Sequence, residues 1–215
     1  MDTILIFIFQ LAILLFSVMI HEVSHGLMAL RLGDETAKQA GRLTLNPIKH
    51  IDPVGSILVP LLLTLSGSGI IVGWAKPVPY NPMLLHKDYK YGALKVALAG
   101  PFSNIVIASV FSIVIRLFGG VFSGPALSLF GFVVFLNILL AVFNMLPIPP
   151  LDGSKILTTL LPRNAAFAIE RMGLWGMILI FGFLFFFFPV ISAITFVVFK
   201  ALVGDAGVDS FVNFF

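Results

Sequence analysis

Residues 4–25 read ILIFIFQLAILLFSVMIHEVSH, and this stretch decides the fold class of the chain. From Ile4 to Ile20 it contains one amide, one serine and no charged residue. An α-helix of about 20 predominantly apolar residues is long enough to cross the hydrocarbon core of a bilayer. The stretch therefore predicts a membrane-spanning helix over about residues 3–30, with ionisable side chains near its C-terminal end.

The whole chain has the composition of an integral membrane protein. Of its 215 residues, 59% are hydrophobic and 11% are charged, whereas a soluble domain carries about 25% charged residues. We expect an all-α, polytopic helical bundle of four to six spans that forms a single membrane-embedded domain over 1–215, with its core over about 3–160. The net charge of +3 indicates loops that face anionic lipid or cytoplasm, so the bilayer is an expected partner and nucleic acid is not.

Three further segments have the length and composition of membrane spans, at about 93–118, 127–149 and 174–199. The apolar stretch 54–73 is ambiguous because Pro60 and a Ser-Gly run interrupt it. Lys and Arg concentrate in cytoplasmic loops. If 54–73 enters the membrane and returns on the same side, three loops on that side hold 11 of the 13 Lys and Arg residues: 31–52, 74–95 and 151–173. We therefore expect 54–73 to be re-entrant.

The segment 41–53 alternates polar and apolar residues and ends in turn-forming residues. This pattern predicts a short β-hairpin near the membrane surface. An extended substrate could pair with the edge of such a hairpin.

The polar cluster in the first predicted span has a specific spacing. His21 and His25 are four residues apart, so they lie on one helix face and can both reach one metal ion. Glu22 projects about 100° round the helix from His21, where it can contact a water on that metal without being a ligand. This is the H-E-x-x-H signature of zinc metallopeptidases. The alternative is a helix with two hydrogen-bonded histidines and an unrelated carboxylate.

A catalytic zinc needs three protein ligands and an open position for water, and the chain has no cysteine to supply thiolates. Asp152 is the distinctive candidate for the third ligand, because it follows a predicted span within NMLPIPPLDG, residues 144–153. Three prolines in four residues cannot continue a helix, so the chain unwinds there and can lay Asp152 against another helix. The alternative is that Asp152 caps a helix beginning near Ser154.

The other acidic and histidine side chains are weaker candidates for the third ligand. His50, Asp52, His86 and Asp88 are all predicted to lie in loops. His50 and Asp52 are either ordinary polar loop residues or groups that support the metal ligands. The remaining carboxylates are read as solvated charges or as residues on the opposite side of the membrane: Asp34, Glu35, Glu170, Asp205 and Asp209.

With these motifs, the chain resembles the site-2 protease family of intramembrane zinc metalloproteases, peptidase family M50. The resemblance rests on H-E-x-x-H in an apolar helix, on the N-x-x-P-x-P-x-L-D-G element of residues 144–153, and on GPFSN at 100–104, which is similar to the family's G-P-x-x-N. It covers about residues 12–160 and is closest to the short prokaryotic members. The PDZ-like insertion and the CBS-like pair of longer members are missing.

The resemblance implies one zinc ion per chain, bound by His21, His25 and Asp152, with Glu22 as the catalytic base. It also implies that Asn144 holds substrate or stabilises the developing negative charge, although a hydrogen bond between helices is an alternative for this side chain. The implied substrate is a transmembrane protein cut within or near a span. The implied location is the prokaryotic plasma membrane, as a multi-pass protein.

Other polar and small residues are read structurally. Asn104 is expected to make a bond between helices or to support a ligand. Gly26 and Gly100 are expected to permit close helix packing. Two other functions compete with proteolysis: a metal transporter, which usually has ionisable groups along several spans, and a non-catalytic scaffold, which has no use for Glu22.

Overall fold

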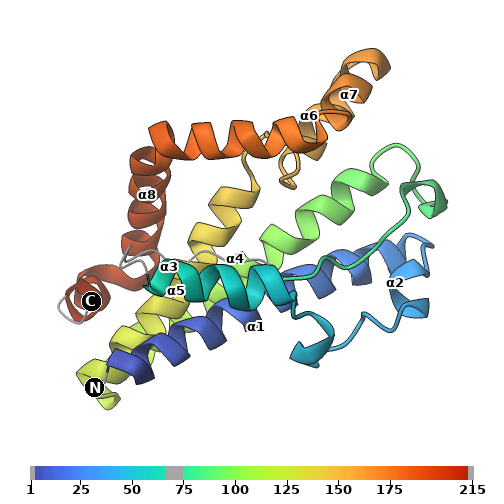
Figure 1. Cartoon of the computed structure of the whole chain (residues 1–215). Coiled ribbons are helices and arrows are strands. Elements are labelled where there is room, and N and C mark those ends of the chain that lie inside the picture. Colours follow the sequence, from blue (N-terminus) through green and yellow to red (C-terminus); the bar gives the residue numbers. More distant parts are fainter. Residues whose placement is uncertain (1–2, 66–74, 213–215) are drawn as a thin grey trace. The chain divides into compact units, whose positions relative to one another are not determined.

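The computed structural model describes residues 3–65 and 75–212 (Figure 1). Within these residues the chain is helical and contains no β-strand. It divides into two compact units, Met1–Gly100 and Pro101–Phe215. The division falls inside helix α4 (Gly92–Phe118), so this helix contributes its first third to one unit and its remainder to the other.

Among the described residues, four helices are long and apolar enough to cross a membrane: α1 (Thr3–Arg31), α4, α5 (Gly124–Asn144) and the Phe186–Asp205 part of α8 (Gly173–Val212). Three of them match predicted spans, and the fourth overlaps the second half of the predicted 174–199 segment and extends beyond it. The chain is therefore a multi-pass membrane protein. The third span ends at Asn144 rather than near residue 149, because the prolines that follow it cannot continue a helix.

The first unit is built around α1. The chain continues through short helical elements: α2 (Thr36–Gln39), the 3₁₀ helix η1 (Pro47–Lys49), the π-helix η2 (Pro53–Leu58), α3 (Val59–Leu65) and the 3₁₀ helix η3 (Pro82–Leu84). A buried cluster of Ala29, Leu85 and Val96 joins α1 to the loop before α4 and to α4 itself. In Figure 1 the helix α3 runs beside α1, and side chains of both helices line one pocket.

The predicted β-hairpin at 41–53 is wrong. This segment forms turns and the 3₁₀ helix η1 instead. The reason lies in its Asn-Pro and Asp-Pro pairs, which start helical turns: the Asn46 side chain accepts from the N–H of Ile48, and the Asp52 side chain accepts from those of Val54 and Gly55. An N-cap followed by proline is a signal for a helix start rather than for a strand.

The described residues also give no support to a re-entrant path for 54–73. Its first half is helical, as η2 followed by α3, and residues 66–73 lie outside the described part of the chain. Pro60 does not interrupt the helix, because it occupies the second position of α3, and proline is tolerated in the first turn of a helix.

The second unit packs α5 along α8. It also contains the rest of α4 and three short helices: η4 (Gly119–Val121), α6 (Ser154–Leu160) and α7 (Arg163–Glu170). Its buried core comes from α4, α5 and α8, and comprises Ala108, Ile115, Val134, Ile138, Phe199 and Val203. The helix α8 is bent (Figure 1), with Pro189 inside it and non-helical dihedral angles at Gly204. Arg116 of α4 donates to the carbonyl oxygens of Ala201 and Leu202, just before that break.

A buried polar contact joins two spans of this unit. Nδ2 of Asn104 on α4 donates to Oδ1 of Asn137 on α5 over 2.8 Å, and both side chains are fully buried. The predicted bond between helices is therefore confirmed for Asn104.

Candidate metal centre

His21, Glu22 and His25 form a compact cluster on α1. One potential ligand atom from each of the three side chains lies within 4.8 Å of the others. The two imidazole rings meet edge to face, with centroids 4.6 Å apart and planes at 84°. Both histidines are buried, at 5% and 8% exposure. The helical spacing that the sequence predicts therefore brings these three side chains together.

The ring of His25 is oriented by the backbone of α4. Its Nδ1 lies 2.7 Å from the carbonyl oxygen of Val96. A carbonyl oxygen can only accept, so Nδ1 of His25 carries the proton and donates. In the neutral ring the lone pair is then on Nε2, the atom left to bind a metal. Metal-binding histidines almost always make such a bond with their second nitrogen.

Gly100 lies where the two imidazoles converge. A Cβ atom placed on Gly100 would lie 2.5 Å from Nε2 of His21 and would also contact Nε2 of His25. Both Nε2 atoms therefore lie so close to Gly100 that any side chain there would collide with them. The sequence predicts only that Gly100 permits close helix packing. The structure shows that the side chains packed against it are the imidazoles of His21 and His25. Two imidazole nitrogens beside a carboxylate form a donor set that suits zinc.

Glu22 makes a contact that its helix does not supply. Its Oε2 accepts a hydrogen bond from the backbone N–H of Val78 over 2.9 Å. Val78 belongs to residues 75–81, which precede η3 and form neither helix nor strand. Sequence reasoning missed this residue. The available signal is its place between Pro77 and Pro79, which leaves Val78 as the one backbone donor of that tripeptide.

Asn144 and Asp152 belong to the second unit, where the loop after α5 folds back on itself. The N–H of Gly153 donates to the carbonyl oxygen of Asn144 over 2.7 Å. A Cβ on Gly153 would contact the carbonyl oxygen of Met145 and lie 2.5 Å from that of Leu146, so only glycine allows this closure. The loop thereby draws Asp152 back to the end of α5 that carries Asn144.

The alternatives for Asp152 and Asn144 can each be compared with a local contact in the structure. The N-cap of α6 is Gly153, so Asp152 lies one residue before the capping position that the competing reading assigns to it. The Nδ2 atom of Asn144 donates to the carbonyl oxygen of Leu140, one turn back in its own helix. The roles of Asp152 as third ligand and of Asn144 in catalysis stay predictions.

Asp34 is not a solvated charge as the sequence predicts. Its side chain is fully buried and accepts from the N–H and the hydroxyl of Thr36 and from the N–H of Asn81. Burial favours a higher pKa for the Asp34 carboxyl, but these hydrogen bonds outweigh it and hold the pKa below its ordinary value. His50 bonds the carbonyl oxygen of Thr44, and Asp52 caps η2. Both therefore have structural partners in the loop.

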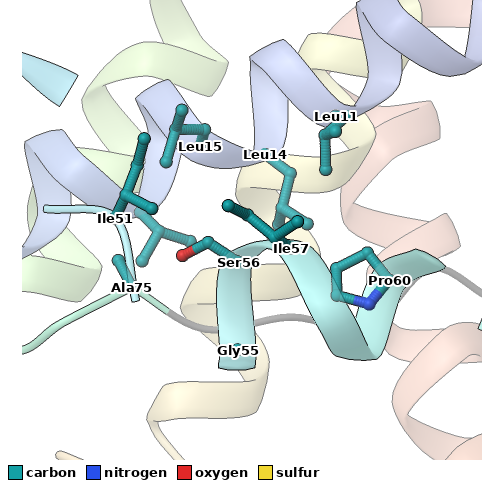
Figure 2. A pocket seen from close by; sticks show the side chains of 10 residues that line it. Leu11, Leu14, Leu15, Ile51, Gly55, Ser56, Ile57, Pro60 and Ala75 are labelled. Carbon is teal, nitrogen blue, oxygen red and sulfur yellow. The ribbon is translucent and has the colours of Figure 1, made fainter. Parts of the chain in front are cut away.

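An apolar groove of about 160 Å³ lies in the same unit. Figure 2 shows Leu11, Leu14 and Leu15 of α1 facing Ile57 of η2 and Pro60 of α3. Its lining is completed by Val18, Ile51, Gly55, Ser56 and Ala75. Val18 is one helical turn before His21, so the groove reaches along α1 to within a turn of the metal cluster.

Comparison with known proteins places these features in a family. The sequence profile of peptidase family M50 matches residues 119–187, which include Asn144 and Asp152. The chain is 37% identical over 172 residues to "Putative zinc metalloprotease YwhC" of Bacillus subtilis, covering 77% of this chain and 74% of that protein. The chain belongs to peptidase family M50.

For two other relatives of this M50 member, the match covers a smaller share of the relative's own length. "Putative zinc metalloprotease Rip2" of Mycolicibacterium smegmatis is 32% identical over 81% of this chain and 66% of that protein. "Putative zinc metalloprotease MJ0611" of Methanocaldococcus jannaschii is 48% identical over 63 residues, which are 29% of this chain and 32% of that protein. No solved structure matches the chain significantly.

Proposed function

We propose that this M50 protein is a zinc metalloprotease that cuts peptide bonds within or near the transmembrane helices of other membrane proteins. One observation carries the proposal: Nε2 of His21 and Nε2 of His25 converge at Gly100, with the Glu22 carboxylate beside them. The relatives YwhC and Rip2 are each named "putative zinc metalloprotease", which agrees with this donor set. The site lies in α1, which is long and apolar enough to span a membrane.

His21, His25 and Asp152 would hold one zinc ion per chain. Zinc at this site supplies a Lewis acid that activates a water and polarises the scissile carbonyl. The Nδ1 bond from His25 to Val96 keeps Nε2 deprotonated for the metal. Asp152 supplies the negatively charged third ligand, carried towards the end of α5 by the closed loop that follows it.

Glu22 and Asn144 act on the substrate. The Glu22 carboxylate takes the proton of the attacking water and passes it to the nitrogen of the leaving amine. The Asn144 amide donates a hydrogen bond to the carbonyl oxygen of the substrate as negative charge develops on it. Its bond to Leu140 is within its own helix, so a change of side-chain rotamer is enough to redirect it. Loss of one such donor typically lowers the rate about 10²–10³-fold.

The membrane setting defines the substrate class and its orientation. A groove with an almost wholly apolar lining, one turn from His21, suits the apolar side chains of a membrane-embedded segment. Three loops hold 11 of the 13 Lys and Arg residues, which favours a cytoplasmic position for these loops in the plasma membrane of a prokaryote. His21 and His25 lie in the last three turns of α1, just before the first of these loops, so water reaches the site from the cytoplasmic edge.

The proposal is tested with purified protein in liposomes that contain a membrane-spanning peptide. We expect the wild type to bind zinc and to cut the peptide within its apolar segment. Glu22→Gln should keep its zinc, measured by elemental analysis, and lose about 10²–10⁴-fold in rate, the usual contribution of a general base. Full activity of Glu22→Gln would refute the role of the base. Zinc flux into the liposomes without peptide cleavage would favour a transporter instead.

A further inference from the structure

Residues 75–81, which we call the strap, cross the first unit beside Glu22. Three backbone N–H groups of the strap are bonded to other elements: Lys76 to the carbonyl oxygen of His50 over 2.9 Å, Val78 to Oε2 of Glu22 over 2.9 Å, and Asn81 to Oδ2 of Asp34 over 2.5 Å. Pro77 and Pro79 have no N–H to donate. The strap therefore reaches Glu22 through one donor at its centre.

Buried polar groups fix the strap on both sides of this donor. Arg42 donates from Nη2 to the carbonyl oxygen of Lys76 over 2.6 Å, and its side chain is 8% exposed. At the other end of the strap, the fully buried Asp34 carboxylate accepts from the N–H of Asn81. Buried polar groups are costly unless they are bonded. Because Arg42 and Asp34 are buried and both bond the strap, they hold its backbone in one position.

The side chain of Val78 adds an apolar contact with the same helix. It is 5% exposed, and a Cβ on Gly26 would lie 2.8 Å from its Cγ1 atom. Gly26 is one turn after Glu22 on α1. Val78 is therefore attached to α1 at two points, by its methyl group at Gly26 and by its N–H at Glu22.

We propose that the backbone N–H of Val78 positions the Glu22 carboxylate for proton transfer. This inference rests on the proposed function of Glu22 as the base. The bond to Oε2 fixes the plane of the carboxylate and leaves Oε1 as the oxygen that takes the proton of the water. A glutamate side chain otherwise samples several rotamers, and loss of alignment of this order costs about 10–100-fold in rate. Val78 is thus a positioning residue, which acts through Glu22 and does not touch the substrate.

A pair of substitutions separates the N–H from the side chain. Val78→Pro removes the donor, and Val78→Ala keeps the donor while it shortens the side chain. Val78 precedes Pro79, and a residue before proline favours an extended backbone. Proline itself also adopts an extended backbone, so Val78→Pro is compatible with this position. With the reconstituted enzyme we expect Val78→Pro to lower kcat about 10–100-fold with KM and zinc content unchanged. We expect Val78→Ala to keep kcat within about 3-fold of the wild type.

Equal losses of kcat in the two variants, or an unchanged kcat in Val78→Pro, would overturn the proposal. A fall in zinc content in parallel with kcat would also overturn it, since the variant would then act on the metal site as a whole. The Glu22→Gln control shows whether the wild-type cleavage depends on the base at all, so a failure of the proposed function is recognised separately.

Hydrogen exchange tests the contact without any activity. In wild-type protein in detergent micelles, the Val78 amide should exchange slowly. Glu22→Ala, which removes the acceptor, should speed its exchange at least about 10-fold, since a lost hydrogen bond of ordinary net strength is worth about that factor. The amides of Lys76 and Asn81 serve as internal controls because their acceptors lie on other residues, and they should not change. An unchanged Val78 rate in Glu22→Ala would exclude the contact and the proposal with it.

Discussion

Nδ1 of His25 donates to the carbonyl oxygen of Val96 over 2.7 Å, across 71 residues of sequence. Val96 and Gly100 are one turn apart on α4, so a single face of this helix does two things. The Val96 carbonyl sets the tautomer of His25, and Gly100, which has no side chain, lets Nε2 of both histidines lie against α4. The proposed metal site therefore depends on α4 as much as on α1, which carries both histidines.

The first prediction concerns the absence of a side chain at Gly100. Gly100→Ala places a methyl group at 2.5 Å from Nε2 of His21, closer than real side chains approach. We expect this variant to lose most of its bound zinc and at least about 10²-fold in cleavage rate, because the ligands must move apart or the metal position is filled. Zinc content by elemental analysis and the cleavage rate are the measurements.

Gly124→Ala is the matched control, because a Cβ there meets nothing within 4 Å. Its zinc content and rate should equal those of the wild type. If Gly100→Ala retained full zinc and full activity, the metal position could not lie at the convergence of the two imidazoles.

Local sequence patterns were enough to predict part of this arrangement. The four long apolar helices follow from composition alone, and the His21, Glu22 and His25 cluster follows from helical periodicity, since both are properties of contiguous residues. An interhelix bond at Asn104 is predicted because unpaired amides are costly inside a membrane protein, but its partner Asn137 is seen only in the structure.

The contacts that were missed join distant parts of the chain. Glu22 and Val78 are 56 residues apart, and Asp34 and Asn81 are 47 residues apart, with no periodic pattern that links either pair. The hydrophilic neighbours of Asp34 predict a solvated side chain, but three converging donors make its burial tolerable. The hairpin prediction at 41–53 is wrong for a different reason: alternating residue types favour a strand there, but Asn46 and Asp52 cap helical turns that replace it.

The second prediction concerns the third ligand. Asp152→Ala should bind zinc more weakly than the wild type, because two histidines alone do not complete a catalytic site. We expect zinc to be lost on dialysis against a mild chelator that leaves the wild type loaded. Asp205→Ala, which removes an exposed carboxylate that pairs with Lys200, is the control and should stay loaded. An unchanged zinc content in Asp152→Ala would point to another third ligand.

The third prediction concerns the apolar groove beside the site. Leu14 lines it, so Leu14→Trp should narrow it. For a membrane-spanning peptide with leucine beside the scissile bond, we expect kcat/KM to fall about 10-fold, the low end for a misfit of one or a few methylenes. The same peptide with alanine at that position should be cut at the wild-type rate.

Phe16→Trp controls for the added indole, since Phe16 is exposed on α1 at 46% and does not line the groove. It should leave the preference between the two peptides unchanged. Equal losses for both peptides in Leu14→Trp would show that the groove does not select the side chain next to the cut.

The fourth prediction is a dependence of stability on acid that originates at Asp34. The pKa of its carboxyl is lower in the folded protein than its ordinary value of 3.8, so the unfolded chain binds this proton more readily. The stability that Asp34 contributes is therefore complete above pH 3.8 and is lost as the pH falls through its folded pKa. Asp34→Asn, which cannot ionise, should unfold more easily at neutral pH and show a flatter acid dependence. Thermal unfolding in mild detergent across the acid range measures both effects.

Asp88→Asn is the comparison, because Asp88 is a partly exposed carboxylate whose pKa is lowered by its bond to Lys95. Since solvent screens such a surface pair, its loss should alter the acid dependence much less. Parallel acid profiles for Asp34→Asn and the wild type would mean that the buried carboxylate does not hold the strap through its charge.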